Sequence, residues 1–150
     1  MKKMLMCAAV AFLSFTLFAQ RAEYITDMIE TSTATYGKVS YLSAVYQGLV
    51  GESASYADAF IALQKAGQIR SSVGQNDVVS LKELSRIMAK LWNIKGGLMY
   101  RITKGSGRYA FRQFKADGIL SNDANPSKKV SGVEVLNLYT ACQQKYGDAQ

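Results

Sequence analysis

The chain has 150 residues, with 18 lysines and arginines against 11 aspartates and glutamates, and it contains no histidine. Histidine is the usual general base and the commonest transition-metal ligand, so Ser-His-Asp and Cys-His catalysis and a structural zinc site are excluded. The length suits one domain with a single hydrophobic core.

Residues 1–19 are predicted to be a signal peptide. Lys2 and Lys3 form its basic start, and the apolar run from Leu5 to Phe18 is too short to span a bilayer comfortably. Ala19 offers a small residue for cleavage. We therefore expect export to the periplasm or cell envelope, with no transmembrane segment after cleavage. The remaining basic residues are spread along the chain, which argues against a nucleic acid partner.

Residues 20–52 are predicted to form an N-terminal helical segment. Apolar residues first recur at helical spacing from Tyr24 to Ile29 and again from Val39 to Val50, and Gly51 is expected to end the second helix. A further helix fits residues 53–66. Its expected N-cap is Ser53, because a serine oxygen can accept a hydrogen bond from the first turn.

Two short phrases share one pattern, "VSLKEL" from Val79 and "VSGVEV" from Val130. Each places a serine three residues before a glutamate, which is the capping box that opens a helix. The sequence therefore predicts that helices begin at Leu81 and Gly132, with both glutamates reaching back to the serine amides. Cys142 follows in the second helix, either buried or joined to another chain by a disulfide.

A basic and aromatic segment lies between these helices. Gly105-Ser106-Gly107 forms a turn, and residues 108–116 read as a helix with an apolar face. Aromatic and basic side chains together can stack on sugar rings and pair with carboxylates or phosphates. The predicted ligand- or partner-binding residues are Tyr100, Arg101, Lys104, Arg108, Tyr109 and Arg112. The alternative is a solvated loop in which Tyr109 packs at the start of the helix.

The chain also contains an internal repeat with a shift of 51 residues. Ala59-Phe60 then falls on Ala110-Phe111, and Val79-Ser80 on Val130-Ser131. Gly67 falls on Gly118, and each glycine is expected to end the helix before it. We therefore expect an all-α fold, a small single domain in which two helix-loop-helix units, 53–92 and 107–147, pack behind the N-terminal segment.

This layout resembles the S-layer homology (SLH) repeat, whose first helix ends in Gly-Ile and whose second opens with Thr-Arg-Ala-Glu. The segments "KAGQI" and "KADGIL" match the first part, and the two phrases stand where Thr-Arg-Ala-Glu would be. The resemblance implies an anionic cell-wall polymer as ligand. However, the arginine that helps to hold that polymer is replaced by Leu81 and Gly132.

The segment from Gly96 to Phe114 is also similar to small exported proteins of spirochaetes. We therefore expect a non-catalytic exported envelope protein that binds a cell-wall polymer or an envelope assembly. The alternative is a structural subunit of a periplasmic complex, flagellar or outer-membrane, that acts by protein–protein contact. No carboxylate pair suggests a glycosidase, and Lys128 and Lys129 oppose calcium binding in the loop from Asp123 to Glu134, so no cofactor or metal is expected.

Overall fold

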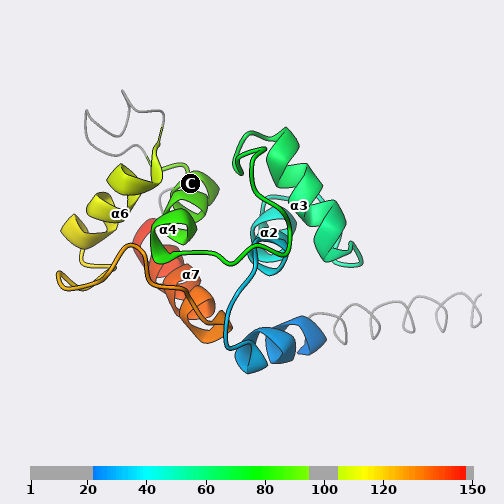
Figure 1. The fold of residues 1–150 in the computed structure, drawn as a ribbon, viewed down its shortest axis with the longest axis horizontal. Helices are drawn as coiled ribbons and strands as arrows, with labels where there is room; N and C mark the ends of the chain where they lie inside the picture. The colour runs from blue at the N-terminus through cyan, green and yellow to red at the C-terminus, as the bar shows by residue number, and fades with distance from the viewer. Residues whose placement is uncertain (1–21, 95–104, 148–150) are drawn as a thin grey trace, which may run out of the picture.

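The computed structural model describes residues 22–94 and 105–147, in which six helices and no strands occur (Figure 1). The first helix covers residues 22–30 and is called the N-terminal helix below. The others are α2 (Tyr36–Tyr46), α3 (Tyr56–Lys65), α4 (Leu81–Leu91), α6 (Gly107–Ala116) and α7 (Gly132–Tyr146). The all-α prediction is confirmed for these residues. None of their helices is long and apolar enough to cross a membrane, and the predicted signal peptide lies outside them.

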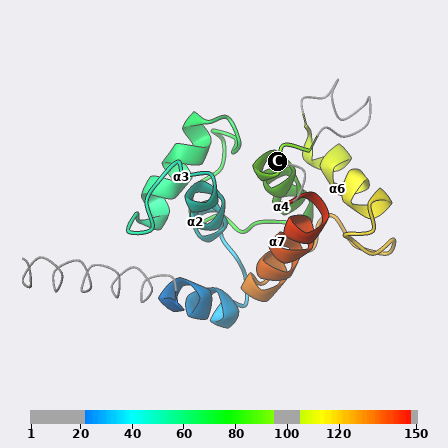
Figure 2. The ribbon, with the colours of Figure 1, turned by 180° about the vertical axis from the view of Figure 1, so that it is seen from behind.

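The helices pack mainly in pairs. α3 lies along α2 and α6 lies along α4, while α4 also contacts α2 and α7 (Figures 1 and 2). The apolar faces of the helices form the core, since Leu84, Ile87 and Met88 of α4 and Phe114 of α6 are almost completely buried. Burying side chains of this size stabilises the fold by about 1.5–3 kcal/mol each.

Helix ends follow the glycine pattern, with one correction. Gly67 and Gly118 end α3 and α6 as predicted, each in the left-handed region with φ of 66° and 75°. α2, however, ends at Tyr46 and not at Gly51. The stop is Gly48, at φ 66°, where the Gly48 amide donates to Val45 O at 3.0 Å. A glycine adopts this conformation without the steric cost of a Cβ.

Helix starts also follow the sequence in part. α4 and α7 begin at Leu81 and Gly132 as predicted, and Ser131 with Glu134 forms the full capping box. The prediction for Glu83 is wrong: Ser80 caps the Glu83 amide, but the carboxylate pairs with Arg70 at 3.3 Å and Arg86 at 3.6 Å. Two cations outcompete a single amide for the carboxylate.

The N-cap of α3 is Ser55 and not Ser53. Asp58 stands three residues after Ser55, accepts from its amide at 3.3 Å, and donates its own amide to the Ser55 hydroxyl at 3.1 Å. Ser53 has no carboxylate at the matching position, because residue 56 is a tyrosine. The reciprocal pair of hydrogen bonds therefore decides where this helix begins.

Three helices start at one point inside the molecule. Their N-caps are Thr35 for α2, Ser80 for α4 and Ser131 for α7. The residues just before these caps hydrogen-bond through their backbones in a closed ring: Val79 N–H to Ala34 O at 3.0 Å, Ala34 N–H to Val130 O at 2.8 Å, and Val130 N–H to Val79 O at 3.3 Å. Their side chains are at most 1% exposed. We call these three residues the backbone ring.

A second set of bonds surrounds the ring. The first amide of α2 donates to Asp77 O at 3.0 Å, that of α4 to Lys128 O at 2.8 Å, and that of α7 to Thr31 O at 2.9 Å. The first amides of a helix have no partner within the helix, and leaving them buried without one would be costly. Each of the three helices thus satisfies its first turn with the chain that leads into another.

Gly132 is required by this arrangement. A Cβ built on Gly132 would lie 1.9 Å from the carbonyl oxygen of Met28, at the end of the N-terminal helix. Any side chain would therefore separate that helix from the start of α7. The close approach of Met28 leaves no room at Gly132 for the arginine of the SLH signature. At the matching position of α4, Leu81 is only 9% exposed.

Replacing Gly132 with alanine should lower the free energy of unfolding by about 3 kcal/mol, because backbone must move to admit the methyl group. Gly51→Ala is the matched control, since a Cβ there meets nothing within 4 Å. It should change stability by less than about 0.5 kcal/mol. Urea denaturation followed by circular dichroism measures both. Equal stability of the two variants would contradict the close approach of Met28.

Candidate functional site

The structure describes half of the predicted binding residues. Arg108, Tyr109 and Arg112 lie on α6, whereas Tyr100, Arg101 and Lys104 lie outside the described residues. Arg108 and Arg112 are exposed on successive turns, and Tyr109 is half-buried between them. The structure therefore brings three of the six residues together on one helix.

Tyr109 and Phe111 support the cations of this helix. The Arg112 guanidinium carbon lies 5.8 Å from the centre of the Tyr109 ring, and Lys115 Nζ lies 4.9 Å from the centre of the Phe111 ring. A cation over an aromatic face is attracted by the ring quadrupole by about 0.5–1 kcal/mol at exposed sites. The charges are thus held beside the helix, where they can face a ligand.

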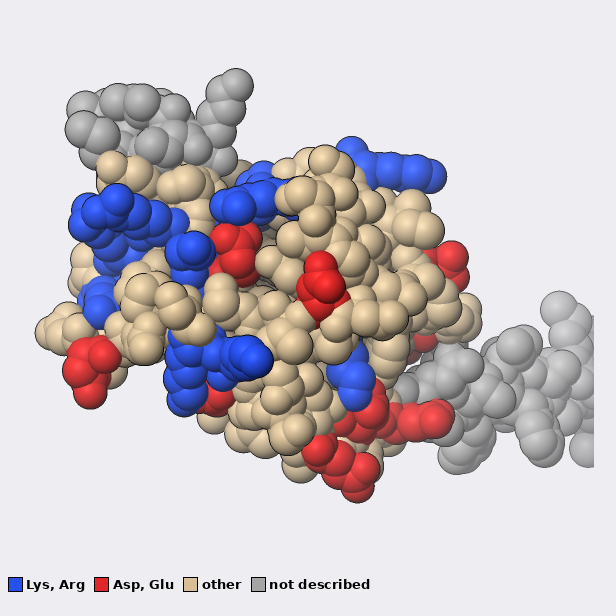
Figure 3. Space-filling view, viewed as in Figure 1, with Lys and Arg blue, Asp and Glu red and all other residues tan. Residues whose placement is uncertain are grey.

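α4 adds further positive charge beside α6. A Cβ on Gly107 would lie 3.2 Å from Cγ of Lys82, so the start of α6 abuts the start of α4. Figure 3 shows lysine and arginine gathered over this side of the molecule, and acidic residues over the N-terminal helix. We call Lys82, Arg108, Arg112 and Lys115 the α6 basic face. Carboxylates and phosphates are the groups that such a face attracts.

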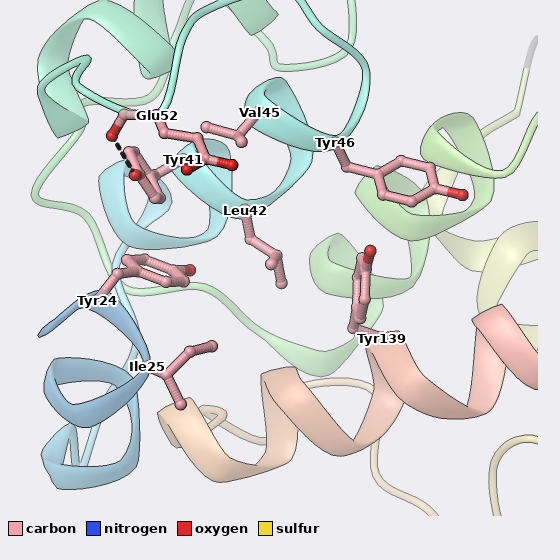
Figure 4. Close-up of a pocket in the computed structure, with 8 residues that line it drawn as sticks. All are labelled: Tyr24, Ile25, Tyr41, Leu42, Val45, Tyr46, Glu52 and Tyr139. Atoms are coloured by element: carbon pink, nitrogen blue, oxygen red, sulfur yellow. Dashed lines mark hydrogen bonds between the residues drawn. The ribbon is translucent and has the colours of Figure 1, made fainter. Parts of the chain in front are cut away.

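A second feature was not predicted from the sequence. A hollow of about 310 Å³ opens between the N-terminal helix, α2 and α7 (Figure 4). Its lining consists of Tyr24, Ile25, Tyr41, Leu42, Val45, Tyr46, Glu52 and Tyr139. A neighbouring hollow of about 330 Å³ shares Tyr24, Tyr41 and Glu52 and is lined also by Glu23 and Asp27. We call the two together the tyrosine cleft.

Hydrogen bonds fix the rings on one side of the tyrosine cleft. Tyr24 Oη donates to Lys38 O at 3.0 Å, and Tyr41 Oη donates to Glu52 O at 2.5 Å. The two ring centres are 4.5 Å apart. Burial raises the pKa of Tyr24 well above its ordinary value, so its phenol stays protonated.

On the other side the cleft reaches a second aromatic group. Tyr46 and Tyr139 meet edge to face at 5.8 Å between ring centres, and Trp92 lies 4.8 Å from Tyr46 and 5.8 Å from Tyr139. Trp92 is only 3% exposed and belongs to the hydrophobic core. No pattern in the sequence predicted this cleft, because its tyrosines come from helices that are distant along the chain.

Asp27 links three elements at the acidic end of the cleft. Its carboxylate accepts from Lys38 Nζ at 2.8 Å and from Tyr56 Oη at 2.6 Å. These two hydrogen bonds lower the pKa of Asp27 below its ordinary value of 3.8, with the Lys38 bond as the larger cause. The carboxylate thereby joins the N-terminal helix to α2 and α3.

Cys142 and Glu134 each have a structural environment in the described ranges. Cys142 is completely buried, and burial raises the pKa of its thiol to about 12, so the reactive thiolate is not formed. Glu134 has its capping role and also pairs with Lys128. In residues 22–94 and 105–147, no group of three or more acidic or cysteine side chains could hold a metal ion.

Comparison with protein-family models and with curated proteins found no match to this chain.

Replacing Asp27 with asparagine should lower the free energy of unfolding by about 1 kcal/mol at pH 7, a value reduced for the partial exposure of the pair. A carboxylate with a lowered folded-state pKa stabilises the fold above its unfolded-state pKa, and this contribution is lost as pH falls through the folded-state pKa. The difference from the wild type should therefore shrink below about pH 4. Urea denaturation at several pH values measures it.

Glu30→Gln is the control for this experiment, since it removes an exposed carboxylate from the same helix. It should change stability by less than about 0.5 kcal/mol at pH 7. A loss from Asp27→Asn that stays constant from pH 7 to pH 2 would show that the ion pair does not stabilise the fold.

Proposed function

We propose that this protein is exported and acts without catalysis, by binding an anionic cell-wall polymer or envelope assembly through the α6 basic face. The observation that carries the proposal is the exposure of Arg108 and Arg112 on successive turns of α6, with Lys115 continuing the row. Repeated cations on one helix match the repeated charges of a polymer.

The charge distribution supports this proposal. The acidic residues before α4 are Glu23, Asp27, Glu30, Glu52, Asp58 and Asp77, and three of them line the tyrosine cleft. The α6 basic face lies on another side of the molecule from the N-terminal helix, as Figure 3 shows. An anionic polymer would be drawn to α6 and repelled by the opposite region, which would orient the protein on the wall.

We further propose that residues 53–92 and 107–147 form an SLH-like repeat that has kept its scaffold and changed its binding surface. The segments "VSLKEL" and "VSGVEV" lie at the starts of α4 and α7. The preceding helices, α3 and α6, end at Gly67 and Gly118. The signature arginine would be sterically excluded at Gly132 and is replaced by a buried leucine at Leu81. The binding surface would then lie on α6.

The alternative is a structural subunit of a periplasmic complex that acts by protein–protein contact. Ile29 and Val133 support it, because they are 56% and 42% exposed. Both adjoin the contact between Met28 and Gly132, so they flank the same junction of the N-terminal helix with α7. Exposed apolar side chains that lie close together are typical of interaction surfaces.

Sedimentation with purified cell wall tests the proposed function. The double variant Arg108→Ala/Arg112→Ala should bind at least about tenfold more weakly than the wild type, because two charge-assisted contacts are lost. Binding of the wild type should also weaken as salt is added.

The matched control is Lys65→Ala/Lys145→Ala, which removes the same charge from exposed positions on α3 and α7. It should bind the wall as the wild type does. Equal weakening of both double variants would mean that only net charge matters and would refute a site on α6. Co-purification with one stoichiometric protein, without wall binding, would favour the structural subunit.

A further inference from the structure

A hollow of about 450 Å³ lies between α7 and the loop of residues 117–131 that joins α7 to α6 (Figure 1). We call it the α7 groove. Aliphatic side chains line much of it, and Leu81 and Leu138 among them are only 9% and 5% exposed. The others are Ile119, Leu120, Ala124 and Ala141.

The internal repeat explains why this groove is open. A shift of 51 residues places Ser121, Asn137 and Ala141 where the first unit has Arg70, Arg86 and Lys90. In the first unit, Arg70 and Arg86 pair with Glu83, and Lys90 Nζ donates to Gly67 O at 2.6 Å. These long side chains join α4 to the end of α3 and to the loop that follows. Their short counterparts in the second unit leave the matching face of α7 open.

The loop that forms one wall of the groove is held in place from two sides. At the start of α4, the Leu81 amide donates to Lys128 O at 2.8 Å. From α6, Lys115 Nζ donates to Asn122 O at 2.7 Å. A groove whose walls are fixed before binding loses less conformational entropy when a ligand enters it.

Two asparagines give the groove polar groups, one from each wall. Asn137 on α7 is exposed and makes no hydrogen bond to another described residue. In the loop, Asn125 Oδ1 accepts from the Ser127 amide at 2.9 Å, while its NH₂ group has no partner in the described part of the chain. A carboxamide carries the same donor and acceptor groups as a peptide bond. The charged lining residues, Lys128 and Glu134, pair with each other, so the groove favours an uncharged ligand.

We propose that the α7 groove binds an extended, uncharged peptide segment of a partner protein. One aliphatic side chain of the peptide lies against Leu120, Leu138 and Ala141. Asn137 both donates to the peptide backbone and accepts from it, and Asn125 donates to it. An apolar lining with a few placed polar groups is the usual composition of a binding pocket. This site goes beyond the proposed function, because it takes an uncharged peptide and does not use the α6 basic face.

The probe is acetyl-Gly-Gly-Leu-Gly-Gly-amide, titrated into the protein and followed by heteronuclear NMR correlation spectra. It should bind saturably and shift the side-chain amide signals of Asn125 and Asn137. An analogue with serine in place of leucine should bind at least about tenfold more weakly, because the aliphatic burial is lost. A second analogue has esters in place of the two amides beside the leucine. It should bind about fivefold more weakly, because an ester has no N–H donor.

Asn137→Ala should weaken the leucine peptide about fivefold and the ester analogue by less, because the ester has already lost the N–H that Asn137 accepts. Asn122→Ala is the matched control, since Asn122 is exposed in the same loop and does not line the groove. Ala141→Phe should abolish peptide binding by filling the groove. Its control is Thr140→Phe, at an exposed position of α7 outside the lining. Thermal unfolding checks that all variants remain folded.

No saturable binding of the leucine peptide, equal affinity for the serine peptide, or equal loss in Asn122→Ala and Asn137→Ala would overturn the proposal. Tighter binding of the uncharged disaccharide cellobiose would also overturn it. So would a dimer in sedimentation that Ala141→Phe dissociates, since a second copy would then occupy the groove. Arg108→Ala/Arg112→Ala should bind the peptide as the wild type does, so loss of wall binding alone leaves this site untouched.

Discussion

The structure depends on the need to satisfy three helix N-termini at one buried point. Each helix start has amides that cannot bond within the helix, and burying them without a partner would be costly. The backbone ring of Ala34, Val79 and Val130 and the surrounding bonds to Asp77, Lys128 and Thr31 meet this need. Each helix start is completed by the chain that leads into another, so no start is satisfied alone.

This constraint places the remaining elements. With α2, α4 and α7 fixed at the ring, α3 and α6 pack on the outside of α2 and α4. The N-terminal helix is held against α7 by the close approach of Met28 to Gly132. The α6 basic face therefore lies on an outer helix, whereas the tyrosine cleft lies where the N-terminal helix, α2 and α7 meet. One scaffold thus presents a basic face on one helix pair and a tyrosine-lined cleft at another junction.

The local signals in the sequence predicted much of this fold. Serine and glutamate at capping spacing located the starts of α4 and α7, and Gly67 and Gly118 located two ends, because these positions are governed by the backbone of a few neighbouring residues. The same reasoning failed where an alternative lay nearby. Ser55 with Asp58 was a better cap than Ser53, and arginines from α4 and the preceding loop drew Glu83 away from Ser80.

Long-range features could not be predicted in this way. The third member of the backbone ring, Ala34, precedes a threonine with no glutamate three residues later, so no repeated phrase marks it. The tyrosine cleft joins Tyr24 to Tyr139, residues that only the packing of helices brings together. In the candidate site, Arg108 and Arg112 could be predicted to share a face because helical spacing alone decides it. Their position beside Lys82 depends on how α6 crosses α4.

Hydrogen exchange of the ring amides tests this account most directly. If the three helix starts complete one another, the amides of Ala34, Val79 and Val130 should exchange only on global unfolding, with the same free energy of opening. Nuclear magnetic resonance of the native protein in deuterated water measures each amide separately. Exchange of any one of the three more than about tenfold faster than the others, through local opening, would contradict the account.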